Sequence, residues 1–415
     1  MSRDTTAETV SGTGALTGGG SGGASGGGSG AGRAVTGAGR HTRRRVVALA
    51  LLAPALIATA APGATARDAR PGAVQRQLDL LVERDGVPGA LAYVNGRTYT
   101  AGTAEIGTGR PMVDADARFR LASDTKAFTA TAVLRLVAEG KVRLDAPAGR
   151  YVPQLAESPV TVRQLLKQRS GLPEYTNLVD WNGGPYTDED FLALALAEGP
   201  DFAPDTEWAY SNTNYLALGL VINKASGQEY RTYIERTVLR PLDLRNTYWP
   251  APGELTLRGP HAHNYGYHPA DPGAGVVDVT ELPGYEFGPS GSLVSTPKDL
   301  NTFWEGLFDG RLLPGWAVRQ MTGDTTDVGG RDVYPRGSRY GYGVASIPLS
   351  CGGAYWGHGG DLPGNSVGGG HATTGRGNVT VYTTTSAATG DRLRHLQGAV
   401  DAALCAKGRG IGGGP

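Results

Sequence analysis

Two serine–lysine pairs with the spacing Ser-x-x-Lys supply candidate nucleophiles, Ser123 with Lys126 and Ser295 with Lys298. Residues three apart on a helix lie on one face. A lysine there can take the serine proton if burial or a cationic neighbour lowers its pKa. A long apolar helix face follows Ser123, so Lys126 is predicted to point into packed protein. Ser295 instead precedes a Thr-Pro pair, the arrangement expected of a helix cap. We therefore predict Ser123 as the nucleophile and Ser295 as a cap.

A tyrosine and an amide follow at Tyr210 and Asn212. In extended chain, residues two apart point the same way. A tyrosine can relay a proton if a nearby cation stabilises its phenolate, and an asparagine can both donate to and accept from a substrate amide. Taken alone, the two residues also fit a turn with a packed tyrosine.

The segment Trp356-Gly-His-Gly-Gly-Asp361 falls on or beside a predicted strand. Glycines in a strand let a substrate backbone approach closely, and an exposed strand edge can pair with an extended ligand. His358, Gly359, Gly360 and Asp361 are therefore candidate substrate-binding residues. The alternative is a turn with an incidental histidine.

Other motifs are weaker. The run Gly364-Asn-Ser366-Val-Gly368 matches G-x-S-x-G, but a nucleophile elbow needs a helix after the serine, and glycines with a Thr-rich strand pattern follow here. Three histidines, at 261, 263 and 268, lack a carboxylate or cysteine cluster of familiar metal-site spacing, which favours a surface loop. The chain has no G-x-x-x-x-G-K-[ST] and no H-E-x-x-H. We predict neither a metal nor a cofactor.

The elements that must position these residues alternate between helix and strand patterns. Apolar spacing predicts helices over 72–84, 124–139, from 297 onwards and over 389–406. Asn95-Gly96 between two strand patterns predicts a hairpin over 89–100, and further strands are predicted over 354–356, 365–373 and 378–384. Loops and short helices fill 141–287. Short turns between strands imply an antiparallel sheet, so we expect an α/β (α+β) fold in which an inserted helical lobe leaves a cleft for a small molecule.

Composition excludes several classes. The 415 residues carry 39 basic and 39 acidic side chains, so no basic excess favours a nucleic-acid partner. Hydrophobic residues make up 40%, enough for a substantial core. No apolar stretch reaches the ~18–20 residues of a bilayer span, which predicts no stable membrane anchor. Two cysteines are too few for a disulfide scaffold.

Residues 1–66 look like a leader. A Gly/Ser/Ala tract over 12–32 is predicted to be disordered. Four arginines between 40 and 45, the apolar run 46–60 and the small-x-small site at 64–66 form an export signal, and residues 42–47 match a twin-arginine pattern. The alternatives are an uncleaved anchor or a buried helix, which Pro54 and the short apolar run oppose. We expect a secreted protein whose folded part is 67–415.

The order of the three motifs resembles the serine β-lactamase and penicillin-binding-protein superfamily. The chain is most similar to its class C β-lactamase and secreted D-alanyl-D-alanine carboxypeptidase branch. The sequence around the motifs also resembles this superfamily, over Leu121–Val133, over Leu165–Tyr175 with its Ser-Gly-Leu-Pro segment, and over Gly288–Leu300. The resemblance covers about 72–406. It implies a β-lactamase-like fold, with an α/β lobe from about 67–122 and 290–415 and a helical lobe from about 123–289.

The resemblance also implies roles. Ser123 would form an acyl-enzyme, Lys126 and Tyr210 would share proton transfer, and Asn212 would hold the substrate amide. His358 would replace the lysine that many relatives carry in the third motif. The backbone N–H groups of Ser123 and Asp361 would form the oxyanion hole. The implied activity is that of a penicillin-binding, serine-type D-Ala-D-Ala carboxypeptidase, a monomer acting on peptidoglycan-type peptides or β-lactams.

One departure affects the implied substrate. Many relatives carry Thr or Ser in the middle of the third motif, where its hydroxyl helps hold the substrate carboxylate, and Gly359 stands there instead. This favours esterases and D-aminopeptidases of the same fold as alternatives, beside a β-lactamase and a non-catalytic penicillin-binding sensor. Similar secreted carboxypeptidases link this strand region to the last helix, which implies a disulfide between Cys351 and Cys405. Two unpaired buried thiols are the alternative.

Overall fold

The computed structural model describes residues 72–406, except 181, 182, 185, 269, 270, 283–286, 332 and 374–376. The predicted leader and export signal lie outside these residues. The α-helices are α1 Ala73–Glu83, α2 Thr125–Ala138, α3 Val162–Leu166, α4 Asp188–Ala197, α5 Thr213–Ser226, α6 Tyr230–Ile234, α7 Pro297–Phe308, α8 Gly315–Gly323 and α9 Gly390–Cys405. Among the described helices, none combines the length and apolar character needed to cross a membrane.

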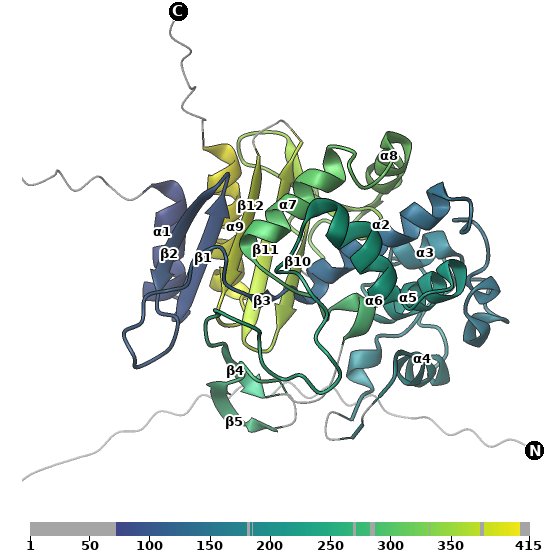
Figure 1. The fold of residues 1–415 in the computed structure, drawn as a ribbon, viewed down its shortest axis with the longest axis horizontal. Coiled ribbons are helices and arrows are strands. Elements are labelled where there is room, and N and C mark those ends of the chain that lie inside the picture. The colour runs from purple at the N-terminus through teal and green to yellow at the C-terminus, as the bar shows by residue number, and fades with distance from the viewer. Residues whose placement is uncertain are drawn as a thin grey trace, which may run out of the picture. The chain divides into compact units, whose positions relative to one another are not determined.

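An antiparallel eight-stranded sheet in the order β2-β1-β12-β11-β10-β9-β8-β7 forms the centre of the described fold (Figure 1). Its strands are β1 Gly89–Val94, β2 Arg97–Gly102, β7 Thr326–Asp327, β8 Arg339–Tyr340, β9 Ala345–Pro348, β10 Ala354–Leu362, β11 Asn365–Ala372 and β12 Asn378–Thr383. Two small pairs, β3 Phe119–Arg120 with β6 Val294–Ser295 and β4 Tyr265–His268 with β5 Asp271–Asp278, lie outside this sheet. The predicted antiparallel sheet flanked by helices is confirmed.

The first hairpin forms for the predicted reason. Asn95 and Gly96 both have positive φ angles, 47° and 86°, as the tight turn of a two-residue hairpin requires. The chain therefore reverses at once, and β1 pairs with β2 on one edge and with β12 on the other. This pairing places the first strands beside the last ones.

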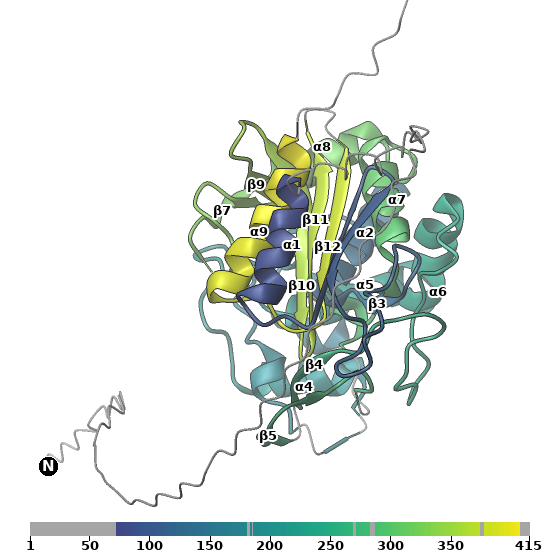
Figure 2. The same cartoon turned by 90° about the vertical axis from the view of Figure 1, so that its left-hand side faces the viewer.

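Helices α1 and α9 pack against each other and cover one face of the sheet (Figure 2). On α1 the residues Val74, Leu78 and Leu81 recur at helical spacing and are buried. They join Val400 and Leu404 of α9 in one apolar cluster with β1 and β12. Burial of this stripe is what orders both helices, because isolated helices of this length are marginal in water.

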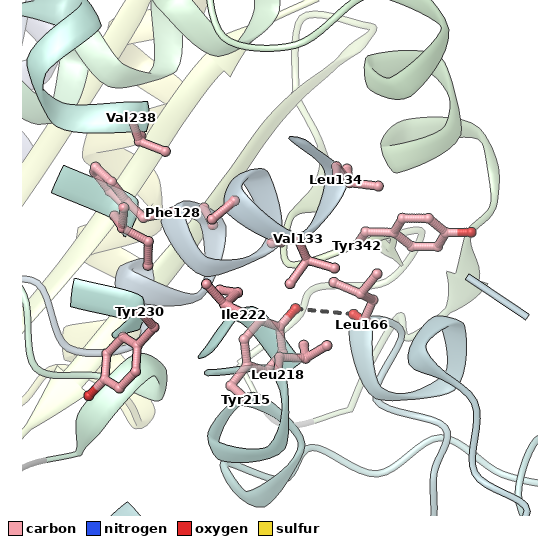
Figure 3. Close-up of a cluster of buried hydrophobic side chains, with 14 of the residues drawn as sticks. Phe128, Val133, Leu134, Leu166, Tyr215, Leu218, Ile222, Tyr230, Val238 and Tyr342 are labelled. Atoms are coloured by element: carbon pink, nitrogen blue, oxygen red, sulfur yellow. Dashed lines mark hydrogen bonds between the residues drawn. The ribbon is translucent and has the colours of Figure 1, made fainter. Parts of the chain in front are cut away.

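The opposite face carries a second core around α2. Phe128 and Val133 of α2 meet Tyr215 and Ile222 of α5 (Figure 3). The Tyr215 hydroxyl donates to the Leu166 carbonyl oxygen across this core, at 3.1 Å. Helix α2 is buried along most of its length, so the residues at its N-terminus are held rigidly between the sheet and the helices.

Two local predictions need correction. The cap of α7 is Thr296, whose side chain accepts from the Asp299 N–H, and not Ser295. Ser295 ends β6 and its hydroxyl bonds Thr247 at 2.7 Å, because the strand pairing with β3 continues through it. The strand predicted over 354–356 continues to Leu362 as β10, because β11 offers it a partner along that whole length.

Candidate active site

Ser123 lies in a single 3-10 turn, η1 Ala122–Asp124, that leads directly into α2. Lys126 is completely buried, and its Nζ lies 3.0 Å from Ser123 Oγ. The same nitrogen contacts Asn212 Oδ1 at 2.6 Å and the Ser290 carbonyl oxygen at 2.8 Å. The predicted serine–lysine contact is therefore present.

Burial decides the charge of this lysine. It lowers the pKa of Lys126 to about 7, while the nearby carboxylates of Glu174 and Asp124 oppose that shift. A lysine with a pKa near neutrality is partly uncharged at physiological pH and can accept a proton from a hydroxyl. Lys298, in the other Ser-x-x-Lys match, is exposed and forms an ion pair with Asp116, so it has no such environment.

The backbone before the nucleophile is strained. Ala122 has a φ of 49°, in the left-handed region that residues with a Cβ seldom adopt. Such conformations cost about 1–3 kcal/mol and persist only where the surroundings enforce them. Here β10 lies directly against the turn: a Cβ added to Gly360 would sit 2.2 Å from the Leu121 carbonyl oxygen. Glycine at 360 thus allows β10 to pack against the turn that carries Ser123.

Tyr210 and Asn212 both face Lys126. The Tyr210 ring centroid lies 4.9 Å from Lys126 Nζ. Its hydroxyl oxygen is buried and has no hydrogen-bond partner of regular geometry among the described residues. Burial raises the pKa of Tyr210 well above its ordinary value, and the Ser123 hydroxyl acts in the opposite direction. The extended backbone that we predicted is wrong at Asn212, which is helical as the N-cap residue of α5.

Sequence reasoning missed Glu174. Its Oε2 accepts from the Asn212 backbone N–H at 2.6 Å, and its Oε1 accepts from Asn212 Nδ2 at 3.2 Å. These contacts turn the Asn212 amide so that its oxygen faces Lys126. Glu174 directly follows the Ser-Gly-Leu-Pro segment that carries part of the family resemblance. This position next to a family motif is the feature of the sequence that could have identified Glu174 as a site residue.

His358 lies on β10 and is 3% exposed. Burial, followed by the charge of Lys126, lowers the pKa of His358 to about 3. The imidazole is therefore neutral at physiological pH, unlike the lysine that stands there in many relatives. Its Nε2 lies 3.2 Å from the Tyr340 hydroxyl, and its ring centroid lies 6.2 Å from that of Tyr210.

A cavity of about 800 Å³ joins these groups. Its described lining includes Ser123, Glu174, Tyr210, Asn212, Arg331, His358, Gly359, Gly360 and Asp361. Among these described lining residues, Arg331 is the one lysine or arginine, and its Nη1 donates to the Trp208 carbonyl oxygen at 3.2 Å. The predicted site residues thus line one cavity, except Lys126, which contacts Ser123 and Asn212 without lining it. The oxyanion role of the Ser123 and Asp361 N–H groups stays a prediction.

The other candidates have structural partners. Ser366 lies in β11, followed by more strand, and its hydroxyl donates to Asp361; the nucleophile-elbow geometry is absent there. His263 contacts Asp278 at 2.5 Å. Over the residues described, no group of three His, Cys, Asp or Glu side chains is arranged to hold a metal ion. Cys351 and Cys405 form a disulfide, as the resemblance implied.

Solved structures similar to this chain include two amide hydrolases. A D-stereospecific amidohydrolase from Streptomyces sp. is 33% identical, with a TM-score of 0.69 over 81% of this chain and 98% of that one. A D-amino acid amidase from Ochrobactrum anthropi SV3, complexed with L-phenylalanine amide, is 28% identical, with a TM-score of 0.69 over 80% of this chain and 96% of that one.

A curated relative is penicillin-binding protein 4* of Bacillus subtilis, 32% identical over 154 residues, which are 36% of this chain. The match spans about a third of that relative's length, 34%. The family model described as Beta-lactamase matches residues 65–404. The chain therefore belongs to the Beta-lactamase family, within the serine β-lactamase and penicillin-binding-protein superfamily.

Proposed function

We propose that this protein is a serine amidohydrolase that cleaves amides of D-amino acids, or D-peptides, that carry a free α-amino group. The observation that carries the proposal is Glu174, a carboxylate that lines the cavity beside Asn212 and Ser123. A carboxylate at this position favours an ammonium group on the acyl part of the substrate. The two amide hydrolases among the similar structures support the same substrate class.

The proposed reaction is acyl transfer in two steps. Uncharged Lys126 takes the Ser123 proton while Oγ attacks the carbonyl carbon, and the tetrahedral oxyanion sits against the N–H groups of Ser123 and Asp361. As the C–N bond breaks, the proton passes from Lys126 through Tyr210 to the leaving nitrogen. Water then attacks the acyl-enzyme, gives a proton to the same pair, and Ser123 leaves with a proton restored.

Each oxyanion donor is expected to be worth about 3–4 kcal/mol in the transition state. Neutral His358 contributes no charge of its own. Its Nε2 contacts the Tyr340 hydroxyl, and its ring packs beside that of Tyr210, so its proposed role is to pack against the tyrosine that relays the proton. A protonated histidine there would repel Lys126 in its charged form.

The test is a side-by-side assay of D-phenylalaninamide, its N-acetyl derivative and its L-enantiomer. We expect hydrolysis of the D-amide, and a loss of about 100-fold in kcat/KM on N-acetylation, because the ammonium–carboxylate contact disappears. Glu174→Gln should remove that discrimination and Glu174→Asp should restore part of it. Equal rates on the free and acetylated D-amides would refute the proposal.

A second candidate, D-Ala-D-Ala carboxypeptidase, is favoured by Arg331, whose guanidinium lines the cavity and is suited to a C-terminal carboxylate. The assay separates the two: a carboxypeptidase would release D-alanine from N-acylated D-Ala-D-Ala and ignore D-phenylalaninamide. Arg331→Gln should then abolish activity. A non-catalytic sensor would instead be labelled by a fluorescent penicillin and never turn over.

We also propose that the protein is exported. The support is the Cys351–Cys405 disulfide, since such bonds persist mainly in oxidising compartments, together with the predicted signal. Secretion of a tagged full chain, lost when Arg43 and Arg44 are both changed to Lys, would test export by the twin-arginine route.

A further inference from the structure

The cavity continues past the nucleophile, around the part of β10 that β9 does not cover. Strand β9 pairs with β10 only from Ala354 to Gly357. The rest of β10, which carries the third motif, therefore has no strand beside it on that edge among the described residues. Beyond this edge the cavity reaches the face of the sheet that α9 covers, where Leu393, Leu396 and Gln397 line it.

Side-chain alternation along β10 and β11 fixes which groups face α9. A Cβ added to Gly368 would lie 2.7 Å from a Leu396 methyl carbon, so Gly368 faces α9. Asp361 lies on the same face, because its carboxylate accepts from Ser366, two residues before Gly368, and from Ser386 at 2.7 Å. Gly359 is two residues from Asp361 and shares that face.

Gly359 leaves the connection between the catalytic end and the α9 end of the cavity open. A Cβ added there would meet a single atom within 4 Å, the Val367 carbonyl oxygen at 3.3 Å. A larger side chain at this position would extend into the cavity, so glycine joins the catalytic end to the α9 end.

The α9 end is lined mainly by apolar side chains. Val333, Ile347, Ala387, Ala388, Leu393 and Leu396 contribute to it. Leu393 is only partly buried and belongs to none of the apolar core clusters that the described residues form. A leucine that lines a cavity without joining the core is available for contact with a ligand. Asp361 adds a carboxylate to this end, which disfavours a second carboxylate on the ligand.

We infer that the α9 end of the cavity is a leaving-group pocket for apolar amines and alcohols. The orientation rests on the proposed function: if Glu174 binds the α-amino group of the acyl part, the group on the other side of the scissile bond extends past Gly359 toward Leu393. An aromatic ring then lies against Leu393, Val333 and Ile347. Arg331 lines the same cavity, but its Nη1 already donates to the Trp208 carbonyl oxygen.

Two substrate pairs test this inference in the full chain. The first pair is D-phenylalanine benzylamide and D-phenylalaninamide. The second pair is benzyl acetate and ethyl acetate, two esters that carry no α-amino group. We expect kcat/KM to favour the benzyl member by at least about tenfold. Leu393→Ala should reduce that preference about tenfold, and Leu393→Phe should retain most of it. Arg394→Ala, on the exposed side of the same helical turn and ion-paired with Asp391, is the matched control and should leave the preference unchanged.

The outcomes separate the two proposals. If D-phenylalaninamide is not cleaved but the ester preference depends on Leu393, the proposed function fails and the pocket stands. Equal kcat/KM within both pairs overturns the pocket, as does a benzyl preference that survives in Leu393→Ala. Loss of preference in Arg394→Ala to the same extent also overturns it, because the effect would then come from α9 as a whole.

Discussion

At the scale of single residues, Lys126 and its neighbours determine when the nucleophile can react. Its Nζ makes three hydrogen-bond contacts, with Ser123 Oγ, Asn212 Oδ1 and the Ser290 carbonyl oxygen. Burial opposes its charge and the carboxylates of Glu174 and Asp124 favour it. The balance keeps the pKa within reach of neutral pH, so small changes nearby should alter activity in a predictable direction.

The pH dependence of acylation follows from this balance. Only uncharged Lys126 accepts the Ser123 proton, so the acylation rate should rise about tenfold per pH unit below a pKa of about 7 and level off above it. His358, with a pKa of about 3, should add no inflection between about pH 5 and pH 9. Labelling by a fluorescent penicillin across this range gives the profile. Lys126→Ala should abolish labelling while the circular dichroism spectrum stays native, and a labelled variant would show that the proton takes another route.

Replacing Glu174 should move the same profile. The Glu174 carboxylate raises the pKa of Lys126, so the neutral isostere in Glu174→Gln should shift the inflection to lower pH. At about pH 5 the variant should therefore acylate faster relative to its own plateau than the parent does. The absolute plateau should fall, because Asn212 loses a charged partner. Thr176→Val, which also lines the cavity, is the control, and an inflection that stays in place in Glu174→Gln would contradict the assigned coupling.

At the scale of elements, the site depends on β10 lying against the turn before α2. Hydrophobic periodicity and Asn-Gly chemistry were sufficient to predict α1, the first hairpin, α9, β11 and β12, and the start of β10, but not the short edge strands β7, β8 and β9. Motif order was sufficient to select Ser123, Lys126, Tyr210 and Asn212 as candidates, and the structure brings them together. The missed features depend on tertiary contacts: the Ala122 backbone is enforced from outside, and Glu174 gains its place through α5. Thr296 rather than Ser295 caps α7 because β6 extends one residue further than local preference indicates.

Neighbouring glycines on β10 offer a matched comparison of this packing. Gly360→Ala would place a Cβ 2.2 Å from the Leu121 carbonyl oxygen and 2.8 Å from Ala122 Cβ, so the turn carrying Ser123 must shift. We expect a loss of about 1–3 kcal/mol in the free energy of unfolding and acylation at least tenfold slower. Gly359→Ala, with one contact at 3.3 Å, should lose much less stability. Urea unfolding and penicillin labelling of both variants measure this, and equal losses would show that β10 does not hold the turn.

At the scale of the whole described fold, helix α9 connects the sheet, the cavity and the disulfide. Together with α1, helix α9 covers one face of the sheet. It also contributes Leu393 and Leu396 to the cavity, and it ends at Cys405, which forms the disulfide with Cys351. Cys351 lies between β9 and β10. The disulfide thus ties the far end of α9 to the strand that carries the third motif, so stability and cavity shape depend on the same connection.

Removing that connection should destabilise the protein without removing its chemistry. The two cysteines are 54 residues apart, and a loop of that length is worth about 4 kcal/mol in the chain-entropy model. The double variant Cys351→Ala/Cys405→Ala should therefore unfold at lower urea concentration, with a larger m-value because the unfolded chain without the crosslink is more expanded. Below that midpoint it should still acylate at Ser123, since neither sulfur contacts the catalytic groups. Reduction of the parent with dithiothreitol should reproduce the shift, and reduction of the double variant is the control that should change nothing. An unaltered midpoint would mean that α9 is held by the apolar cluster it shares with α1 alone, and that Leu393 keeps its place at the cavity without the covalent link.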